Sequence, residues 1–295
     1  MKRIVLFMLT NVAVLAVISI LTMVLGVDKW LTAQGLNLPM LLAFSAVVGF
    51  TGSIFSLLIS KWMAKMAYSI HIIDKPQDAA ERWLVLTVTR QAERAGIRTP
   101  EVGIYESPEV NAFATGPSRN NALVAVSSGL LNRMSQPQVE AVLAHEVGHV
   151  TNGDMVTMTL LQGVLNTFVV FLSRIFGYLI DAALKRNDDR GVGMGYFLGS
   201  MICQIVLGIF ASMIVMAYSR RREFKADAMG AQLAGKQNMI SALQRLNDIM
   251  HGGGVLDDRS PALSAFKISN RPSKIMALFS SHPPMEERIA ALQRL

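Results

Sequence analysis

The residues best suited to chemistry are two histidines and the acid that follows the first of them, in the run His145-Glu146-Val147-Gly148-His149. Residues four apart lie on one face of a helix, so both imidazoles can bind a single metal ion. Glu146 then lies beside the metal, where it can hold a water. The chain has only 5 histidines, so two unrelated surface histidines are a poor explanation. The pattern indicates a zinc site that suits hydrolysis.

A catalytic zinc site needs a third protein ligand and keeps a fourth position open. Position 155 is Met155, which excludes a metzincin-type third histidine. Glu223 is favoured because Asp227, four residues further on, shares its helix face, so one carboxylate can bind the metal and the other can hold a histidine N–H. In the alternative reading, Glu223 begins a helix and Asp227 is a surface acid. The remaining candidates for the third ligand are His71, His251, His282, Glu286 and Glu287.

The helix that carries the two histidines has strong start signals. Ser135 and Gln138 form a capping box, and Pro137 lies in the first turn, where its missing N–H costs nothing. We therefore expect a helix over residues 136–150. Short strands are expected over 101–105, 111–115 and 122–126, with turn residues at 116–121, and further helices over 78–95, 222–234, from Asn238 as N-cap to about 250, and 285–295.

Long apolar stretches indicate a membrane protein. Apolar residues make up 52% of the chain and charged residues only 17%, and about 20 apolar residues cross a hydrocarbon core. Buried core helices of this length would have a polar face. In the second stretch, Ser45, Gly49 and Ser53 recur every four residues, as on a close-packing helix face. We expect four hydrophobic helices, over residues 4–26, 39–60, 155–180 and 191–219.

Basic residues flank these stretches on one side. Lys61 and Lys65 follow the second stretch and three arginines, 220–222, follow the fourth, so both termini and residues 61–154 are expected on the cytoplasmic side. The net charge of +7 is thereby explained as a topology signal, which argues against a nucleic-acid partner. The expected organisation is an N-terminal transmembrane hairpin (1–60), a second hydrophobic hairpin (155–219), and one cytoplasmic domain formed by 61–154 and 220–295.

The whole chain resembles the M48 family of membrane-bound zinc metallopeptidases. The resemblance rests on the four apolar stretches and on the motifs at 111–116, 145–149, 152–154, 222–227 and 281–284. It implies a mainly α membrane protein with a gluzincin-like α+β protease domain, in which a small sheet covers the active-site helix. It also implies a bacterial inner-membrane enzyme that degrades damaged or misassembled membrane proteins on the cytoplasmic side, as part of a stress response.

The resemblance assigns roles to further residues. His282 and Arg288 match a family pattern near the zinc ion, which implies a catalytic role for both. His282 either stabilises the oxyanion or caps the metal in a resting state. An ordinary histidine at a helix start is the alternative. Asp154 either orients the metal-site helix or ends it. A substrate-binding edge strand, or else a plain hairpin strand, is formed by Asn111, Ala112, Phe113, Ala114, Thr115 and Gly116.

The expected reaction is hydrolysis of peptide bonds with one Zn²⁺ ion per chain. Glu146 takes a proton from the attacking water and passes it to the leaving amine. The partners are the lipid bilayer, membrane proteins and unfolded polypeptides, and self-cleavage is expected in the loop of residues 251–274. A receptor with a structural zinc site is the first rival, but such sites are usually closed by four cysteine or histidine ligands. A peptidase for prenylated C-termini is the second, and four spans are too few for its chamber.

Overall fold

The computed structural model describes residues 14, 16–21, 23–25, 31–32, 35–184, 193–251 and 280–295. The chain divides into two compact units, one formed by Met1–Ser56 with Met158–Val215 and the other by Leu57–Thr157 with Met216–Leu295. The expected span at residues 4–26 lies largely outside the described residues, and so does the loop at 251–274.

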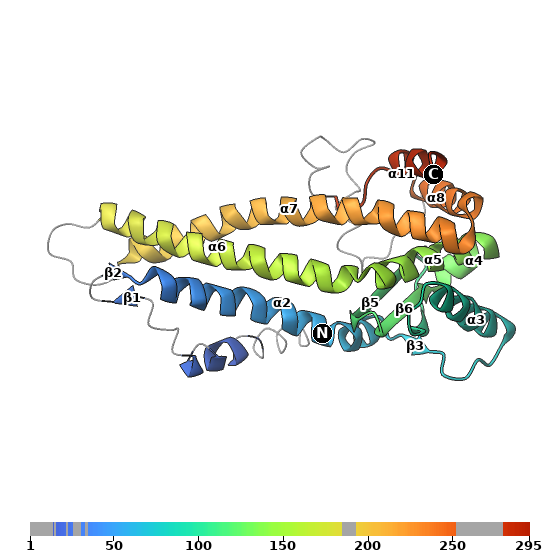
Figure 1. Cartoon of the computed structure of the whole chain (residues 1–295), viewed down its shortest axis with the longest axis horizontal. Helices are drawn as coiled ribbons and strands as arrows, with labels where there is room; N and C mark the ends of the chain where they lie inside the picture. The colour runs from blue at the N-terminus through green and yellow to red at the C-terminus, as the bar shows by residue number, and fades with distance from the viewer. Residues whose placement is uncertain are drawn as a thin grey trace. The chain divides into compact units, whose positions relative to one another are not determined.

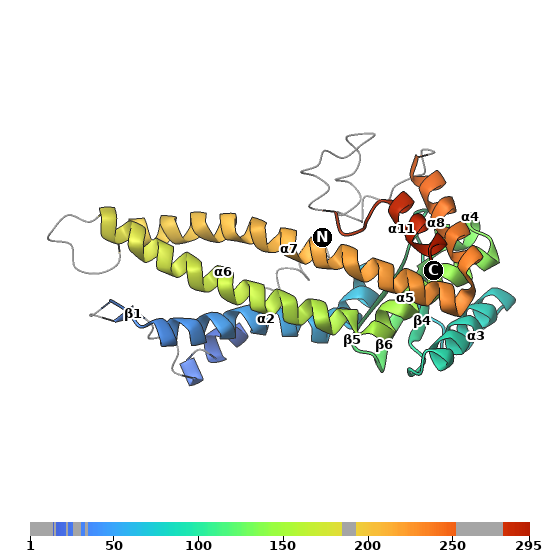
Figure 2. The ribbon, with the colours of Figure 1, turned by 45° about the horizontal axis from the view of Figure 1, so that its top comes forward.

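Three long helices dominate the first unit: α2 (Leu38–Tyr68), α6 (Asp154–Leu184) and α7 (Met194–Ala234). Within the described residues, these three are long and apolar enough to cross a membrane. In this unit α6 lies between α2 and α7 in both views (Figures 1 and 2). A two-stranded ribbon, β1 (Leu31–Thr32) and β2 (Gly35–Leu36), precedes α2.

The helices of this unit touch through small residues. A Cβ atom on Gly49 of α2 would come within 2.6 Å of the backbone nitrogen of Thr167 on α6. Ser45, Gly49 and Ser53 are all buried, which confirms the packing face expected from their spacing. The same holds between α6 and α7, where a Cβ atom on Gly177 would come within 2.8 Å of the Tyr196 carbonyl oxygen. Side chains this small let helix backbones approach closely.

The helix expected from residue 222 is not a separate element. It continues from the fourth apolar stretch, and α7 ends only before Gly235, whose φ of +95° suits glycine. The expectation that Asn238 caps the next helix is also wrong, because α8 (Lys236–His251) begins at Lys236. The Asn238 side-chain amide instead donates to the Ala234 carbonyl at 2.8 Å, so it caps the end of α7.

The second unit contains a four-stranded mixed sheet in the order β3-β4-β6-β5. Strand β3 (His71–Ile72), which the sequence reading missed, pairs antiparallel with β4 (Glu101–Tyr105), and β4 runs parallel to β6 (Asn121–Ser127). Strand β5 (Ala112–Ser118) forms a hairpin with β6 and lies at the edge of the sheet. It extends through residues expected as a turn, because Ser118 pairs with Asn121 and the turn tightens to two residues.

Helix α5 (Gln136–Asn152) lies at the centre of the second unit. In both views it lies between the sheet and α8 (Figures 1 and 2). Its side chains Leu143 and Val147 are fully buried in a cluster with Val124 of β6 and Leu243 of α8. The other helices of this unit are α3 (Ala79–Arg94), α4 (Ser128–Arg133) and α11 (Met285–Gln293).

Candidate metal centre

The metal-site motif lies near the end of α5. The helix begins at the expected cap, where the Ser135 N–H donates to Gln138 Oε1 at 3.0 Å. It ends at Gly153, which adopts a left-handed φ of +69°. Burial is nearly complete over residues 141–150 of this helix, where Glu146 is the one residue that is not buried. Its carboxylate is therefore the group of this segment that substrate and water can reach.

Ligand atoms from three residues converge in this buried place. His145 Nε2 and His149 Nε2 lie 3.1 Å apart. Glu223, which α7 brings in from far along the chain, has no exposed surface. Its Oε2 lies 3.5 Å from His145 Nε2 and its Oε1 lies 3.4 Å from His149 Nε2. These three residues form the one metal-ligating group found among the described residues.

The donor set fits a tetrahedral metal ion. Ligand atoms about 2.0–2.1 Å from such an ion stand about 3.3 Å from one another, close to the separations observed here. Glu223 Oε1 is buried and has no hydrogen-bond partner within the described part of the chain, as expected for a carboxylate oxygen that binds a cation. The two Nε2 atoms face each other, an arrangement that a shared metal ion satisfies.

A carboxylate stands behind each histidine. Asp227 Oδ1 lies 2.9 Å from His145 Nδ1, and Asp154 Oδ2 lies 2.6 Å from His149 Nδ1. Both acids are buried. A carboxylate at Nδ1 keeps the proton there and turns the Nε2 lone pair to the metal. Of the two readings open for Asp154, the geometry supports orientation, because Gly153 is the residue that ends α5.

Arg288 supports this arrangement from α11. Its guanidinium is buried and makes two hydrogen bonds to the Asp227 carboxylate, from Nε at 2.8 Å and from an Nη atom at 2.6 Å. His282 lies beside the third ligand, with Nδ1 2.6 Å from Glu223 Oε2, and its side chain is 56% exposed. His282 therefore contacts a ligand at the open side of the site, whereas Arg288 binds Asp227 and also lies 3.8 Å from Glu223 Oε2.

The other ligand candidates lie elsewhere. His71 is exposed on β3, 3.7 Å from Glu81, while Glu286 and Glu287 are exposed on α11. The side chain of His251 is outside the described residues. A signal that the sequence reading missed is Gly148, where a Cβ atom would lie 3.2 Å from the Ala226 carbonyl oxygen. A glycine inside the motif thus lets α7 approach α5 closely enough to deliver Glu223.

Comparison with known families agrees with this site. Residues 78–295, which contain all three ligand candidates, match the family described as Peptidase family M48. The chain belongs to peptidase family M48. The prediction of a metallopeptidase from the sequence motifs is thereby confirmed.

Relatives of this M48 peptidase match it along its whole length. "Protease HtpX homolog" of Methylacidiphilum infernorum is 61% identical over 100% of this chain and 99% of the relative. "Protease HtpX" of Hydrogenovibrio crunogenus is 55% identical over 99% of this chain and 97% of the relative. Among solved structures, S. mikatae Ste24p matches with a TM-score of 0.63 at 21% identity. That match covers 99% of this chain and 66% of Ste24p, and it shows a shared fold.

When no metal is bound, the carboxylates of the M48 site favour the protonated forms of His145 and His149. Burial lowers the pKa of His149, but contacts with Asp154 and Glu223 outweigh it and raise the pKa to about 9. His145 is also buried, and contacts with Asp227 and Glu223 raise its pKa. A metal ion must therefore displace protons that these carboxylates hold on the imidazoles.

Proposed function

We propose that this membrane metallopeptidase is a zinc-dependent endopeptidase, in which His145, His149 and Glu223 hold one Zn²⁺ ion per chain. The supporting observation is the convergence of two imidazole nitrogens and the two oxygens of one carboxylate at separations of 3.1–3.5 Å in a buried site. Two imidazoles and a carboxylate are the donors of a known class of catalytic zinc site. Zinc, when bound there, would supply Lewis acidity that polarises the scissile carbonyl and lowers the pKa of water.

The chain's own residues would carry the proton transfers. Glu146 takes a proton from the attacking water and passes it to the leaving amine. His282, with its exposed ring, is placed to donate to the carbonyl oxygen as negative charge develops on it. Asp227 and Asp154 keep the imidazoles oriented, and Arg288 positions Asp227. Arg288 is thus proposed as a positioning residue, which revises the catalytic role that the family resemblance implied.

The substrate would bind as an extended chain. Strand β5 lies at the free edge of the sheet and packs against α5 through Ala112 and Ala114. Its outer backbone groups can therefore pair with a substrate strand above the metal-site helix. We propose this role for Asn111–Gly116 and infer that unfolded polypeptides and damaged or misassembled membrane proteins are the substrates.

We extend the proposal to the cellular location of the protein and to its domain organisation. Four hydrophobic helices would hold the chain in a bacterial inner membrane, and residues 61–154 and 220–295 would form one gluzincin-like domain on the cytoplasmic side. The support is the basic residues that flank the apolar helices, Lys61, Lys65 and Arg220 among them. Accessibility of single cysteines to an impermeant reagent tests the orientation, with Cys203→Ser as the background. Labelling of a cysteine at Arg82 from the outside of intact cells would contradict it.

The activity itself is tested with full-length protein in detergent. Unfolded casein should be cleaved when zinc is present and left intact after chelation. Restored cleavage on adding zinc back would support the metal assignment. Intact casein under every metal condition would contradict the proposed function.

The raised pKa of His149 predicts how zinc binding depends on pH. Below about pH 9 the imidazole holds a proton that zinc must displace, so zinc affinity should rise by about tenfold per pH unit for each displaced proton. The check is competition against a chelator of known affinity between pH 6 and pH 9.5. A histidine with its usual pKa of about 6.5 would instead give an affinity that levels off above pH 7.

Asp227→Asn should weaken zinc binding without removing a ligand. A neutral amide accepts the Nδ1 proton of His145 more weakly than a carboxylate does. Loss of a carboxylate that contacts a metal-binding histidine typically lowers metal affinity by about 10–100-fold. Arg288→Lys should give a smaller loss in the same direction, because it keeps the charge and loses the two-point contact. Zinc affinity is the readout, with Asp248→Asn on the surface of α8 as the control. Unchanged affinity in Asp227→Asn would remove its proposed role.

Self-cleavage is expected once membranes are dissolved in detergent with zinc. The expectation rests on the composition of residues 251–274, which combine glycines, a proline and charges. Mass spectrometry should locate cuts near 263–266 or 275–278, and chelator should prevent them. Wild type that stays full-length during long incubation with zinc would refute the expectation.

A further inference from the structure

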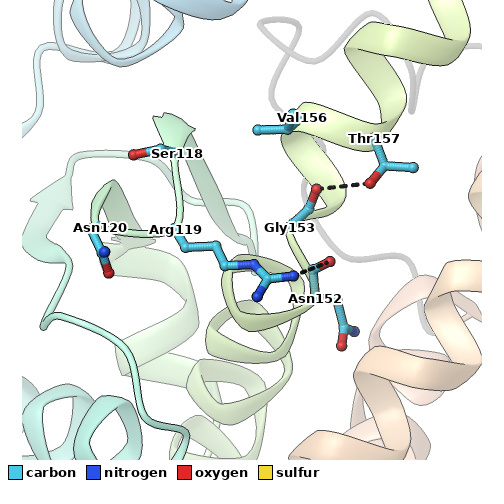
Figure 3. A pocket seen from close by; sticks show the side chains of 7 residues that line it. All are labelled: Ser118, Arg119, Asn120, Asn152, Gly153, Val156 and Thr157. Atoms are coloured by element: carbon cyan, nitrogen blue, oxygen red, sulfur yellow. Dashed lines mark hydrogen bonds between the residues drawn. The ribbon is translucent and has the colours of Figure 1, made fainter.

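A pocket of about 380 Å³ lies one helical turn beyond the metal ligands. It is formed where the tip of the β5–β6 hairpin meets the junction of α5 and α6 (Figure 3). The proposed mechanism does not use it. The pocket is lined by Ser118, Arg119 and Asn120 from the hairpin, and by Asn152, Gly153, Val156 and Thr157 from the junction.

Arg119 gives the pocket a positive charge. It extends from the hairpin towards the junction, where an Nη atom donates to the Asn152 carbonyl at 3.4 Å (Figure 3). This single weak contact leaves most of its five N–H donors free. In the described part of the chain Arg119 forms no ion pair, and the nearest acid along α6, Asp154, is occupied by His149.

The side-chain amide of Asn152 points away from Arg119 (Figure 3), so the guanidinium is the charged donor that this pocket offers. Next to the hairpin tip, the Lys61 ammonium donates to Asn121 Oδ1 at 2.9 Å, but its charge is paired with Glu101 at 2.8 Å, so Arg119 is the unpaired charge here among the described residues. A pocket with a guanidinium that forms no ion pair favours an acceptor with negative charge, and a carboxylate matches the planar fork of arginine.

The course of β5 connects the pocket to the proposed substrate path. The regular pairing of β5 covers Ala112–Thr115, and the register then shifts before Ser118. Gly116 at this bulge has a φ of +148°, and a Cβ atom there would lie 2.2 Å from the Asn121 carbonyl oxygen. A bulge re-aims the residues that follow it. At about 3.3 Å per residue, Ser118 lies about 13 Å along the strand from Ala114.

We propose that this pocket is a specificity site that binds an acidic side chain of the polypeptide substrate, with Arg119 pairing with its carboxylate. The inference rests on the proposed function, because it requires an extended substrate along β5. We take the cleaved bond to lie opposite Ala114. A substrate chain paired with β5 then reaches the pocket about three to five residues from that bond. Peptides with Asp or Glu at that position are therefore preferred over peptides with Lys.

The test uses a series of quenched fluorescent peptides in which one residue is varied at each position in turn. A single Asp, Asn or Lys is placed in turn at each of the five positions on either side of the scissile bond. Full-length zinc-loaded wild type should favour Asp over Lys at one position by about two- to fivefold in kcat/KM, as expected for one partly exposed ion pair. Arg119→Glu should reverse the preference there and leave it unchanged elsewhere.

Arg82→Glu is the matched control, because Arg82 is an exposed arginine on α3, away from the pocket. It should keep the wild-type preference at every position. A merely structural role for Arg119 would slow all peptides alike and leave the ratio of Asp to Lys peptides unmoved. That result would overturn the inference, and so would a loss that appears only in vesicles with anionic lipid, which would assign the pocket to a lipid headgroup.

Binding separates this inference from the proposed function. Glu146→Gln with bound zinc should bind the same peptides without cleaving them, so their dissociation constants can be measured by fluorescence anisotropy. The preference for Asp should appear there too, and should be reversed in the double variant with Arg119→Glu. If casein and peptides resist cleavage while this reversal is seen, the proposed function fails and the binding site stands. Equal affinity for Asp and Lys peptides would overturn the site.

Discussion

Glu146→Gln is expected to keep the metal ion and to lose proteolysis. The side chain follows a ligand in sequence but lies on a different face of α5, and it alone in 141–150 is not buried. An amide keeps its shape and cannot accept a proton from water at neutral pH. Loss of a general base typically lowers the rate by about 10²–10⁴-fold. The measurement is casein cleavage by purified full-length protein, with zinc content determined on the same sample.

Metal content decides how this result is understood. Zinc at the wild-type level with lost activity assigns Glu146 to proton transfer, since a ligand or a structural residue would change the zinc content or the fold. Glu140→Gln is a suitable control, because Glu140 lies on the same helix and pairs with Arg90 at 2.7 Å, outside the metal centre. It should cleave casein as the wild type does. Near-normal cleavage by Glu146→Gln with full zinc would exclude the proposed mechanism.

Local signals explain why much of the metal site was predictable. The start of α5 depends on Ser135 and Gln138, which lie within one turn of each other, and the four-residue spacing of the two histidines follows from helix geometry alone. Glu223 and Asp227 were recognised by the same spacing. Strand β4 has the predicted bounds, Glu101–Tyr105.

Contacts between distant segments explain what was missed. The two-residue strand β3 is too short to show a period, and it forms only because β4 offers it a partner. Arg288 reaches Asp227 across 61 residues of chain, which no local pattern encodes. The three arginines at 220–222 suggested a helix boundary, yet no glycine or proline stands there, so α7 continues. The three arginines show that the environment of α7 changes along its length. The helix itself ends only at a backbone signal, here Gly235.

Glu223→Ala is expected to lose the metal ion together with activity. The carboxylate is fully buried and supplies one of three ligands, with Oε2 also 2.6 Å from His282 Nδ1. Partners behind the ligands are already worth about 10–100-fold in affinity, so removing a ligand should weaken zinc binding by more than about 100-fold. Zinc content after dialysis against a weak chelator is the measurement. Full zinc in a folded Glu223→Ala protein would place the third ligand elsewhere.

A truncated buried residue can also unfold a protein, so the experiment needs two further variants. Glu223→Gln keeps the side-chain volume and the capacity to contact His282 but replaces the anionic ligand, so zinc should be lost while circular dichroism still shows the folded protein. Glu286→Ala changes an exposed acid on α11 and should retain both zinc and activity. Zinc loss in Glu223→Gln with an intact fold therefore separates a ligand from a packing residue. Retention of zinc there would mean that the two histidines hold the ion with a group other than this carboxylate.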